Sequence, residues 1–251
     1  MYKILANSLF LGKDIIYLTE CHSTNDLAME KIRSKALREG SIVITDKQTK
    51  GKGQRGNRWW SEPGMNLTFS LVLQPTFLSP ARQFELSMAV SLALRHALGT
   101  WCEGIKIKWP NDLLHESGKK LGGILIENIL QQKSIEYAVV GIGLNVNQHM
   151  YELPSATSMA DLTGKDFSIP QVLEVIVKYL ERYYLLLKRG EVKKIRAEYL
   201  KEMYRFEAWA NYRDELPFLG KIVGINEEGK LILEKEDGSV NFYGLKEVTY
   251  L

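Results

Sequence analysis

The stretch KWPNDLLHESGKKLGGILIE, residues 108–127, is the most informative part of the sequence. Lys108, Asn111 and Asp112 gather where the short apolar run before them ends and Pro110 turns the chain. A lysine can bind a phosphate, and aspartate or asparagine oxygens can hold Mg²⁺ or orient a polar group. The spacing therefore predicts a strand that ends in a ligand site.

The second half of this stretch begins with Lys120, which enters an apolar run that contains Gly122 and Gly123. A glycine inside a strand carries no side chain, so it leaves room for a ligand against the backbone. A third run, GIGLNVN at 141–147, closes on Asn145 and a second asparagine. A polar residue that closes an apolar strand is either a turn former or a ligand contact.

Apolar residues on both sides of these runs recur with the period of a strand or of a helix. Strands are expected at 41–48, 65–75, 105–109, 120–130 and 136–147, and helices at 23–40, 79–101, 169–190 and 191–205. The segment 148–166 is expected to be mostly loop. This order predicts an α+β fold, a mixed β-sheet with flanking helices.

The pattern of apolar and polar residues changes after residue 205. Residues 206–251 contain short alternating strands separated by turns rich in Asn, Asp and Gly. We therefore expect two domains, a catalytic domain over 1–205 and a small C-terminal β-barrel over 206–251.

Composition excludes several classes of protein. The chain has 251 residues, 45% of them hydrophobic and 25% charged, as in ordinary globular proteins. The net charge of +3 is too weak a bias to indicate nucleic-acid binding. Cys21 and Cys102 are far apart and in no CxxC pair, so reduced thiols in a cytoplasmic protein are expected. No signal peptide and no membrane span are expected.

The glycine-rich loop GKGQRGNRWWSE, residues 51–62, fits GxGxxG at Gly51, Gly53 and Gly56. A dinucleotide fingerprint requires a helix after the loop, and a second strand follows here instead. A P-loop requires Lys-Ser/Thr after the last glycine, and a kinase requires further motifs that this chain lacks. The loop is thus either a solvated hairpin or a basic loop whose backbone N–H groups meet a phosphate species.

Six motifs together indicate a family. They are STN at 23–25, QxxGxGxxG at 48–56, WxS at 59–61 with NL at 66–67, KWPND at 108–112, KLGGILIE at 120–127 and GIGLNVN at 141–147. In order and spacing the chain resembles the biotin protein ligases along nearly its whole length. The KWPND and KLGGI pair is the most specific part of the resemblance.

The resemblance implies a fold related to class II aminoacyl-tRNA synthetases and lipoate ligases, followed by an SH3-like barrel. It also implies a two-step reaction. Biotin and MgATP give biotinyl-5′-AMP and pyrophosphate, and a lysine of a biotin carboxyl carrier domain then displaces AMP. ATP and biotin are therefore the expected substrates, with Mg²⁺ as cofactor. A homodimer is possible in this family, and neither nucleic acid nor membrane is an expected partner.

The resemblance also assigns residues to roles. The expected catalytic residues are Lys120, near the biotin carboxylate and the α-phosphate, and Lys108, near the phosphates. The expected biotin-binding residues are Ser23, Thr24, Asn25, Gln48, Gly51, Lys52, Gly53, Gly122 and Gly123. The expected nucleotide-binding residues are Arg55, Arg58, Trp59, Asn111 and Asn145, with Asp112 as the metal ligand. For Trp59, and for its neighbour Trp60, a place in the core is an equal alternative.

The glycine loop departs from the family's common form, GRGRxGR. Its arginine positions hold Lys52, Gln54 and Asn57, whereas arginines stand at 55 and 58. Lysine keeps the charge but lacks the planar fork of arginine, so the resemblance does not decide which arginine contacts a phosphate. The loop is expected to close over the adenylate and to exclude water.

Two further expectations concern activity. Only 22 residues precede Ser23, whereas a DNA-binding domain needs at least about 50, so we expect no repressor activity. The rival functions are a lipoate or octanoate ligase of the same superfamily and a non-catalytic nucleic-acid-binding protein. Biotin-dependent adenylation distinguishes both from a biotin ligase.

Overall fold

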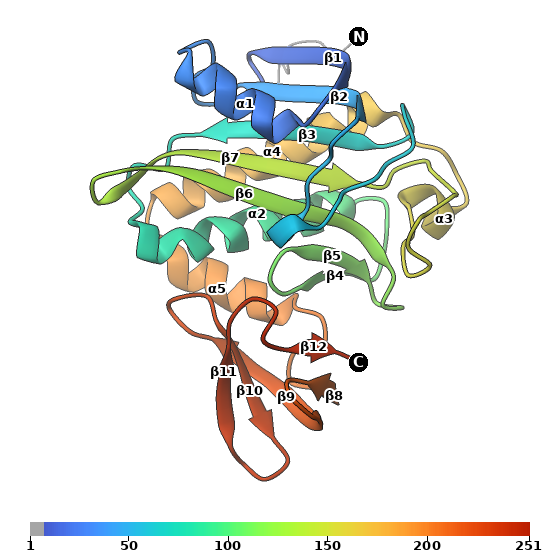
Figure 1. Ribbon diagram of the computed structural model, residues 1–251, viewed down its shortest axis with the longest axis vertical. Coiled ribbons are helices and arrows are strands. Elements are labelled where there is room, and N and C mark those ends of the chain that lie inside the picture. Colours follow the sequence, from blue (N-terminus) through green and yellow to red (C-terminus); the bar gives the residue numbers. More distant parts are fainter. Residues whose placement is uncertain (1–7) are drawn as a thin grey trace.

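A seven-stranded mixed sheet forms the larger part of the computed structural model, which describes residues 8–251 (Figure 1). Its strand order is β1-β2-β3-β7-β6-β5-β4. β1 and β2 are parallel, and the other neighbours are antiparallel. The strands are β1 (Ile15–Cys21), β2 (Ile42–Gln48), β3 (Leu67–Leu73), β4 (Ile105–Lys108), β5 (Asp112–His115), β6 (Lys120–Gln131) and β7 (Ser134–Leu144).

Helices cover both faces of this sheet (Figure 1). α1 (Thr24–Arg33) packs on one face, where Ala28 and Ile32 meet Val43 and Val139. The other helices are α2 (Gln83–Leu98), α3 (Met159–Thr163), α4 (Ile169–Lys188) and α5 (Val192–Lys201). α2 and α4 supply buried apolar residues to the larger core. Because β3 is buried along its whole length, it forms the centre of this packing.

Several predicted boundaries are wrong. The first helix ends at Arg33, not near residue 40, because Lys35 lies in the left-handed region with φ 58°. A 3₁₀ turn (Pro80–Arg82) precedes α2, so the long helix begins later than expected. The segment expected to be mostly loop contains α3, which Ser158 caps by accepting a hydrogen bond from the Asp161 amide.

A five-stranded antiparallel sheet follows, in the order β11-β10-β9-β8-β12. Its strands are β8 (Trp209–Arg213), β9 (Pro217–Ile225), β10 (Leu231–Lys235), β11 (Val240–Tyr243) and β12 (Thr249–Tyr250). The predicted fold class, a mixed sheet with helices followed by a small all-β unit, is confirmed.

The C-terminal sheet is held against the rest of the chain at defined points. The Trp109 indole N–H donates to the carbonyl of Gly229 at 2.9 Å, and the Arg196 guanidinium donates to the carbonyl of Ile225 at 2.7 Å. Gly229 has φ +88°, and a Cβ there would lie 2.4 Å from the ring of Phe84. These contacts hold the turn between β9 and β10 against α2, α5 and the residue that follows β4.

Within residues 8–251, no helix combines the length and the apolar character needed to cross a bilayer. Cys21 and Cys102 are both free thiols, and Cys102 is buried.

Candidate active site

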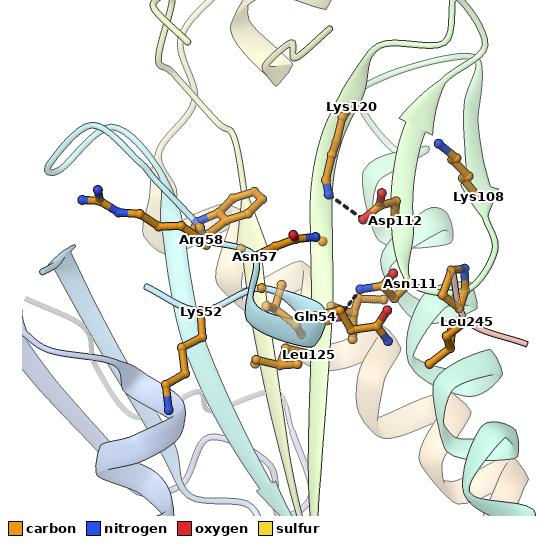
Figure 2. Close-up of a pocket in the computed structure, with 18 of the residues that line it drawn as sticks. Lys52, Gln54, Asn57, Arg58, Lys108, Asn111, Asp112, Lys120, Leu125 and Leu245 are labelled. Carbon is orange, nitrogen blue, oxygen red and sulfur yellow. Dashed lines mark hydrogen bonds and ion pairs between the residues drawn. The ribbon is translucent and has the colours of Figure 1, made fainter. Parts of the chain in front are cut away.

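A cavity of about 600 Å³ opens between α1, the glycine loop, the strands β6 and β7, and the C-terminal sheet (Figure 2). Strand register gathers its walls, since Gly143 lies opposite both Thr68 and Gly123 on the neighbouring strands, and all three line the cavity. Polar side chains line one end of the cavity and cations the other.

The polar end is built where α1 begins beside the end of β2. The backbone N–H of Thr24 donates to Oε1 of Gln48 at 2.8 Å. The Ser70 hydroxyl lies 2.7 Å from the Thr24 hydroxyl and 2.6 Å from Oδ1 of Asn25. Nδ2 of Asn25 donates to the carboxylate of Glu127 at 2.7 Å. These bonds fix the side chains, so that they can present aimed polar groups to a ligand.

Two glycines of β7 form the floor between the two ends. A Cβ on Gly141 would lie 2.3 Å from the Asn25 amide oxygen, and one on Gly143 would lie 2.4 Å from the Trp59 ring. No other residue fits these positions without displacing a wall. The Trp59 indole nitrogen is buried and has no hydrogen-bond partner among the described residues.

The cationic end holds two lysines. The ammonium of Lys120 lies 2.6 Å from Oδ1 of Asp112 (Figure 2). The ammonium of Lys108 lies 4.8 Å from the centre of the Tyr250 ring. Burial lowers the pKa of Lys108, although the carboxylate of Asp112 acts in the opposite direction.

Asn111 joins this end to the strand beneath it. Its side-chain Nδ2 donates to the carbonyl of Ile124 at 2.7 Å, and its backbone carbonyl accepts from the Ile124 amide at 2.9 Å. The amide oxygen of Asn111 is therefore held at a fixed place in the cavity wall.

The glycine loop folds back on itself as a hairpin. Lys52 and Arg58 form an antiparallel bridge, and the Gly53 amide donates to the Asn57 carbonyl at 2.7 Å. The ammonium of Lys52 lies 2.5 Å from the Asp26 carboxylate, so this side chain is directed toward α1 and away from Lys120 (Figure 2).

Most of the residues predicted for the site line the cavity. They are Ser23, Thr24, Asn25, Gln48, Lys52, Gly53, Arg58, Trp59, Lys108, Asn111, Asp112, Lys120 and Gly123. The side chain of Arg55, also predicted, lies outside the described part of the structure.

Three predicted residues do not reach the cavity wall. Asn145 is buried and donates to the carbonyl of Thr157 at 3.0 Å, so its amide holds a loop rather than facing the cavity. A Cβ on Gly122 would lie 2.8 Å from a carbonyl of β7, so this glycine permits strand packing. Gly51 is buried beneath the Trp59 carbonyl.

β12 and the loop before it supply wall residues that sequence reasoning missed, namely Leu245, Lys246, Val248, Thr249 and Tyr250. Their local sequence carries no motif, and only the docking of the two sheets brings them to the cavity.

The donor set at the cationic end suits a metal held mainly by a phosphorylated substrate. Mg²⁺ commonly takes one or two protein carboxylates and completes its shell with phosphate oxygens and water. Asp112 could serve as that carboxylate. Within residues 8–251, no group of three or more His, Cys, Asp or Glu side chains could hold a metal alone.

Comparison with known proteins identifies the family. Residues 17–145 match the model of the biotin/lipoate A/B protein ligase family. The chain is 32% identical over 244 residues to the bifunctional ligase/repressor BirA of Bacillus subtilis, which covers 93% of this chain and 73% of the relative.

Solved structures agree with this match. The biotin protein ligase of Aquifex aeolicus in complex with biotin and ATP superposes with a TM-score of 0.78 at 28% identity, covering 94% of this chain and 98% of that one. The biotin protein ligase of Leishmania major, with a TM-score of 0.62 at 24% identity over 92% and 99% of the two chains, shares the fold. The chain therefore belongs to the biotin/lipoate A/B protein ligase family and, within it, to the biotin protein ligases.

Proposed function

We propose that this chain joins biotin to a lysine of a carrier domain in two steps. In the first step, a biotin carboxylate oxygen bonds to the α-phosphorus of ATP, and the bond from that phosphorus to pyrophosphate breaks. In the second, the lysine amine attacks the biotinyl carbonyl and loses a proton, and AMP leaves. The comparisons establish a biotin protein ligase; the residue roles, the metal and the acceptor are parts of the proposal.

The observation that carries the proposal is the polarity of the cavity. A ureido ring needs a few fixed donors and acceptors within apolar walls, which Gln48, Thr24 and the glycine floor provide. A carboxylate and a triphosphate both carry negative charge, and Lys120 and Lys108 stand together at the other end. One cavity can thus hold both reactants in a line.

Lys120 can act on the first step in two ways. Its ammonium attracts two anions that repel each other, which lowers the entropic and electrostatic cost of bringing them into contact. It also donates to the charge that develops on phosphoryl oxygens in the transition state. Lys108 and the Asn111 amide would hold the remaining phosphates.

Mg²⁺, when bound, would neutralise part of the triphosphate charge, with Asp112 as its protein ligand. Because Asp112 is ion-paired to Lys120, its carboxylate serves both groups. The acceptor is proposed to be a biotin carboxyl carrier domain.

We also propose that the chain divides into functional units near residue 206. Residues up to 205 would carry the polar end and both catalytic lysines. The C-terminal unit would complete the wall at the cationic end, since Thr249 and Tyr250 of β12 and three residues of the loop before it line the cavity.

The test is biotin-dependent exchange of pyrophosphate into ATP, with lipoate and octanoate as parallel substrates and Lys120→Ala as the inactive control. We expect exchange with biotin alone, lost in the variant. Exchange with lipoate instead would contradict the proposal and move the chain to the sister activity. Transfer of biotin to a purified carrier domain then tests the second step.

A further inference from the structure

The ring of Tyr250 faces a cation of the active site. Tyr250 lies in β12, near the end of the C-terminal sheet, and the Lys108 ammonium stands 4.8 Å from its ring centre. A cation within about 6 Å of an aromatic face is attracted by the ring quadrupole. A residue of the second sheet therefore contacts a lysine that the first sheet brings to the cavity.

The structure fixes this ring by its backbone and by a second ring. β12 pairs with β8, with Tyr250 opposite Tyr212, and the amide of Leu251 donates to the Asn211 carbonyl at 3.0 Å. The Tyr212 ring meets the Tyr250 ring edge-on at 5.2 Å and is fully buried. The Tyr250 hydroxyl is buried without a hydrogen-bond partner among the described residues. The contact with Lys108 is therefore made by the ring face and not by the hydroxyl.

Lys108 differs from Lys120 and Lys52 in how its charge is balanced. Lys120 and Lys52 each form an ion pair with a carboxylate. For Lys108, no carboxylate of residues 8–251 lies within the 4.0 Å of an ion pair. An aromatic face stabilises a cation without occupying its hydrogen-bond donors, so all three N–H bonds of Lys108 stay available to an anion.

We propose that Tyr250 is a positioning residue for the nucleotide. Its ring holds the Lys108 ammonium toward the cavity, so the C-terminal sheet contributes to ATP affinity through this contact. The inference rests on the proposed function, because it takes the ATP phosphates as the ligand of Lys108.

The first test compares Tyr250→Leu with Tyr250→Phe in the full chain, by pyrophosphate exchange with ATP or biotin varied in turn. Tyr250→Leu removes the ring, and we expect it to raise the KM for ATP roughly 3- to 30-fold while the KM for biotin stays unchanged. Tyr250→Phe keeps the ring and is expected to behave as the wild type. The control, Phe242→Leu, removes an exposed ring from β11 of the same sheet and should change neither constant.

The second test asks whether Tyr250 acts through Lys108. In a Lys108→Ala background, Tyr250→Leu should add no further increase in the KM for ATP, because the two residues share one interaction. A full additive effect would overturn the proposal. So would an equal rise for Tyr250→Leu and Tyr250→Phe, or a rise in the KM for biotin of the same size.

A third measurement covers the case in which Tyr250→Leu unfolds. Phenylalanines that carry increasing numbers of ring fluorines keep the shape of the side chain and weaken its negative face. The dissociation constant of ATP, measured by calorimetry, should rise with each fluorine, and a flat series would overturn the proposal. Wild-type protein that binds ATP but shows no biotin-dependent exchange would overturn the proposed function instead, and the calorimetric series would still test Tyr250.

Discussion

Lys120 at the start of β6 and Asp112 at the start of β5 form an ion pair with 2.6 Å between Nζ and Oδ1. The resemblance assigns them different partners: Lys120 is expected to meet the biotin carboxylate and the α-phosphate, and Asp112 the metal. Because the two side chains are partly buried and contact each other, a change in either leaves the other without its counter-charge. The two roles are therefore coupled.

The first prediction concerns this pair. Lys120→Ala should lower kcat for exchange by on the order of 10²- to 10³-fold, because a donor to the transition-state charge is lost. Asp112→Asn keeps the shape, and it should raise the Mg²⁺ concentration that gives half-maximal exchange. Titrating Mg²⁺ at saturating ATP measures both effects. An unchanged Mg²⁺ requirement in Asp112→Asn would show that Asp112 is not the metal ligand.

A second prediction concerns Gln48, whose Oε1 accepts from the Thr24 amide at 2.8 Å. Gln48→Leu should weaken biotin binding by about 10- to 100-fold, because a buried donor is left unpaired and a ligand contact is lost. The affinity for ATP should not change. Calorimetry with each ligand measures this, and Gln171→Leu, on the exposed side of α4, is the matched control. Equal loss of both affinities would indicate a general distortion of the cavity.

Gly143 gives a third prediction, since a Cβ there would lie 2.4 Å from the Trp59 ring. Gly143→Ala should displace the indole, shift its fluorescence and lower biotin affinity, at a cost in stability of about 1–3 kcal/mol. In Gly224→Ala, the added Cβ would meet its nearest neighbour at 3.6 Å, an ordinary contact, so this strand glycine is the control. Wild-type fluorescence and affinity in Gly143→Ala would contradict the packing described here.

The fourth prediction concerns stability. The buried carboxylate of Glu181 in α4 accepts from the amides of Leu9, Phe10 and Leu11, at 2.7, 2.8 and 3.0 Å. Glu181→Ala should lower the free energy of unfolding by about 2–4 kcal/mol, because three amides lose a charged acceptor.

Urea unfolding measures this change, with Lys178→Ala on the exposed side of the same helix as the control. Glu181→Gln keeps one acceptor oxygen and should fall between the two. A loss no larger than that of Lys178→Ala would mean that these bonds contribute nothing net.

Much of the fold could be predicted because its central strands are simple apolar runs. β3 is buried on both faces, and apart from Thr68 and Ser70 its residues are apolar. β1, at the sheet edge, was missed because its side chains are largely half-buried or exposed and its pattern is weak. β5 was missed because it is only four residues long and begins at Asp112, the last residue of the KWPND motif.

In the site, too, residues within local motifs could be predicted, whereas residues placed by tertiary contacts could not. Lys108, Asp112 and Lys120 could be predicted because they belong to motifs at strand ends. Asn145 was placed with them by its motif, yet its amide is committed to the Thr157 carbonyl, a contact 12 residues away. Tyr250 could not be predicted, because its place depends on the docking of Trp109 against Gly229.

The cavity wall runs from Ser23 to Tyr250, so it combines residues that lie far apart in the chain and leave the ribosome at different times. At about 5–20 residues per second, synthesis separates these two walls by roughly ten seconds or more. During that interval a nascent chain can form the polar end but lacks Tyr250 beside Lys108. A growing chain should therefore bind biotin before it binds ATP with full affinity, and it should form little adenylate until Tyr250 has been synthesised and has folded into place.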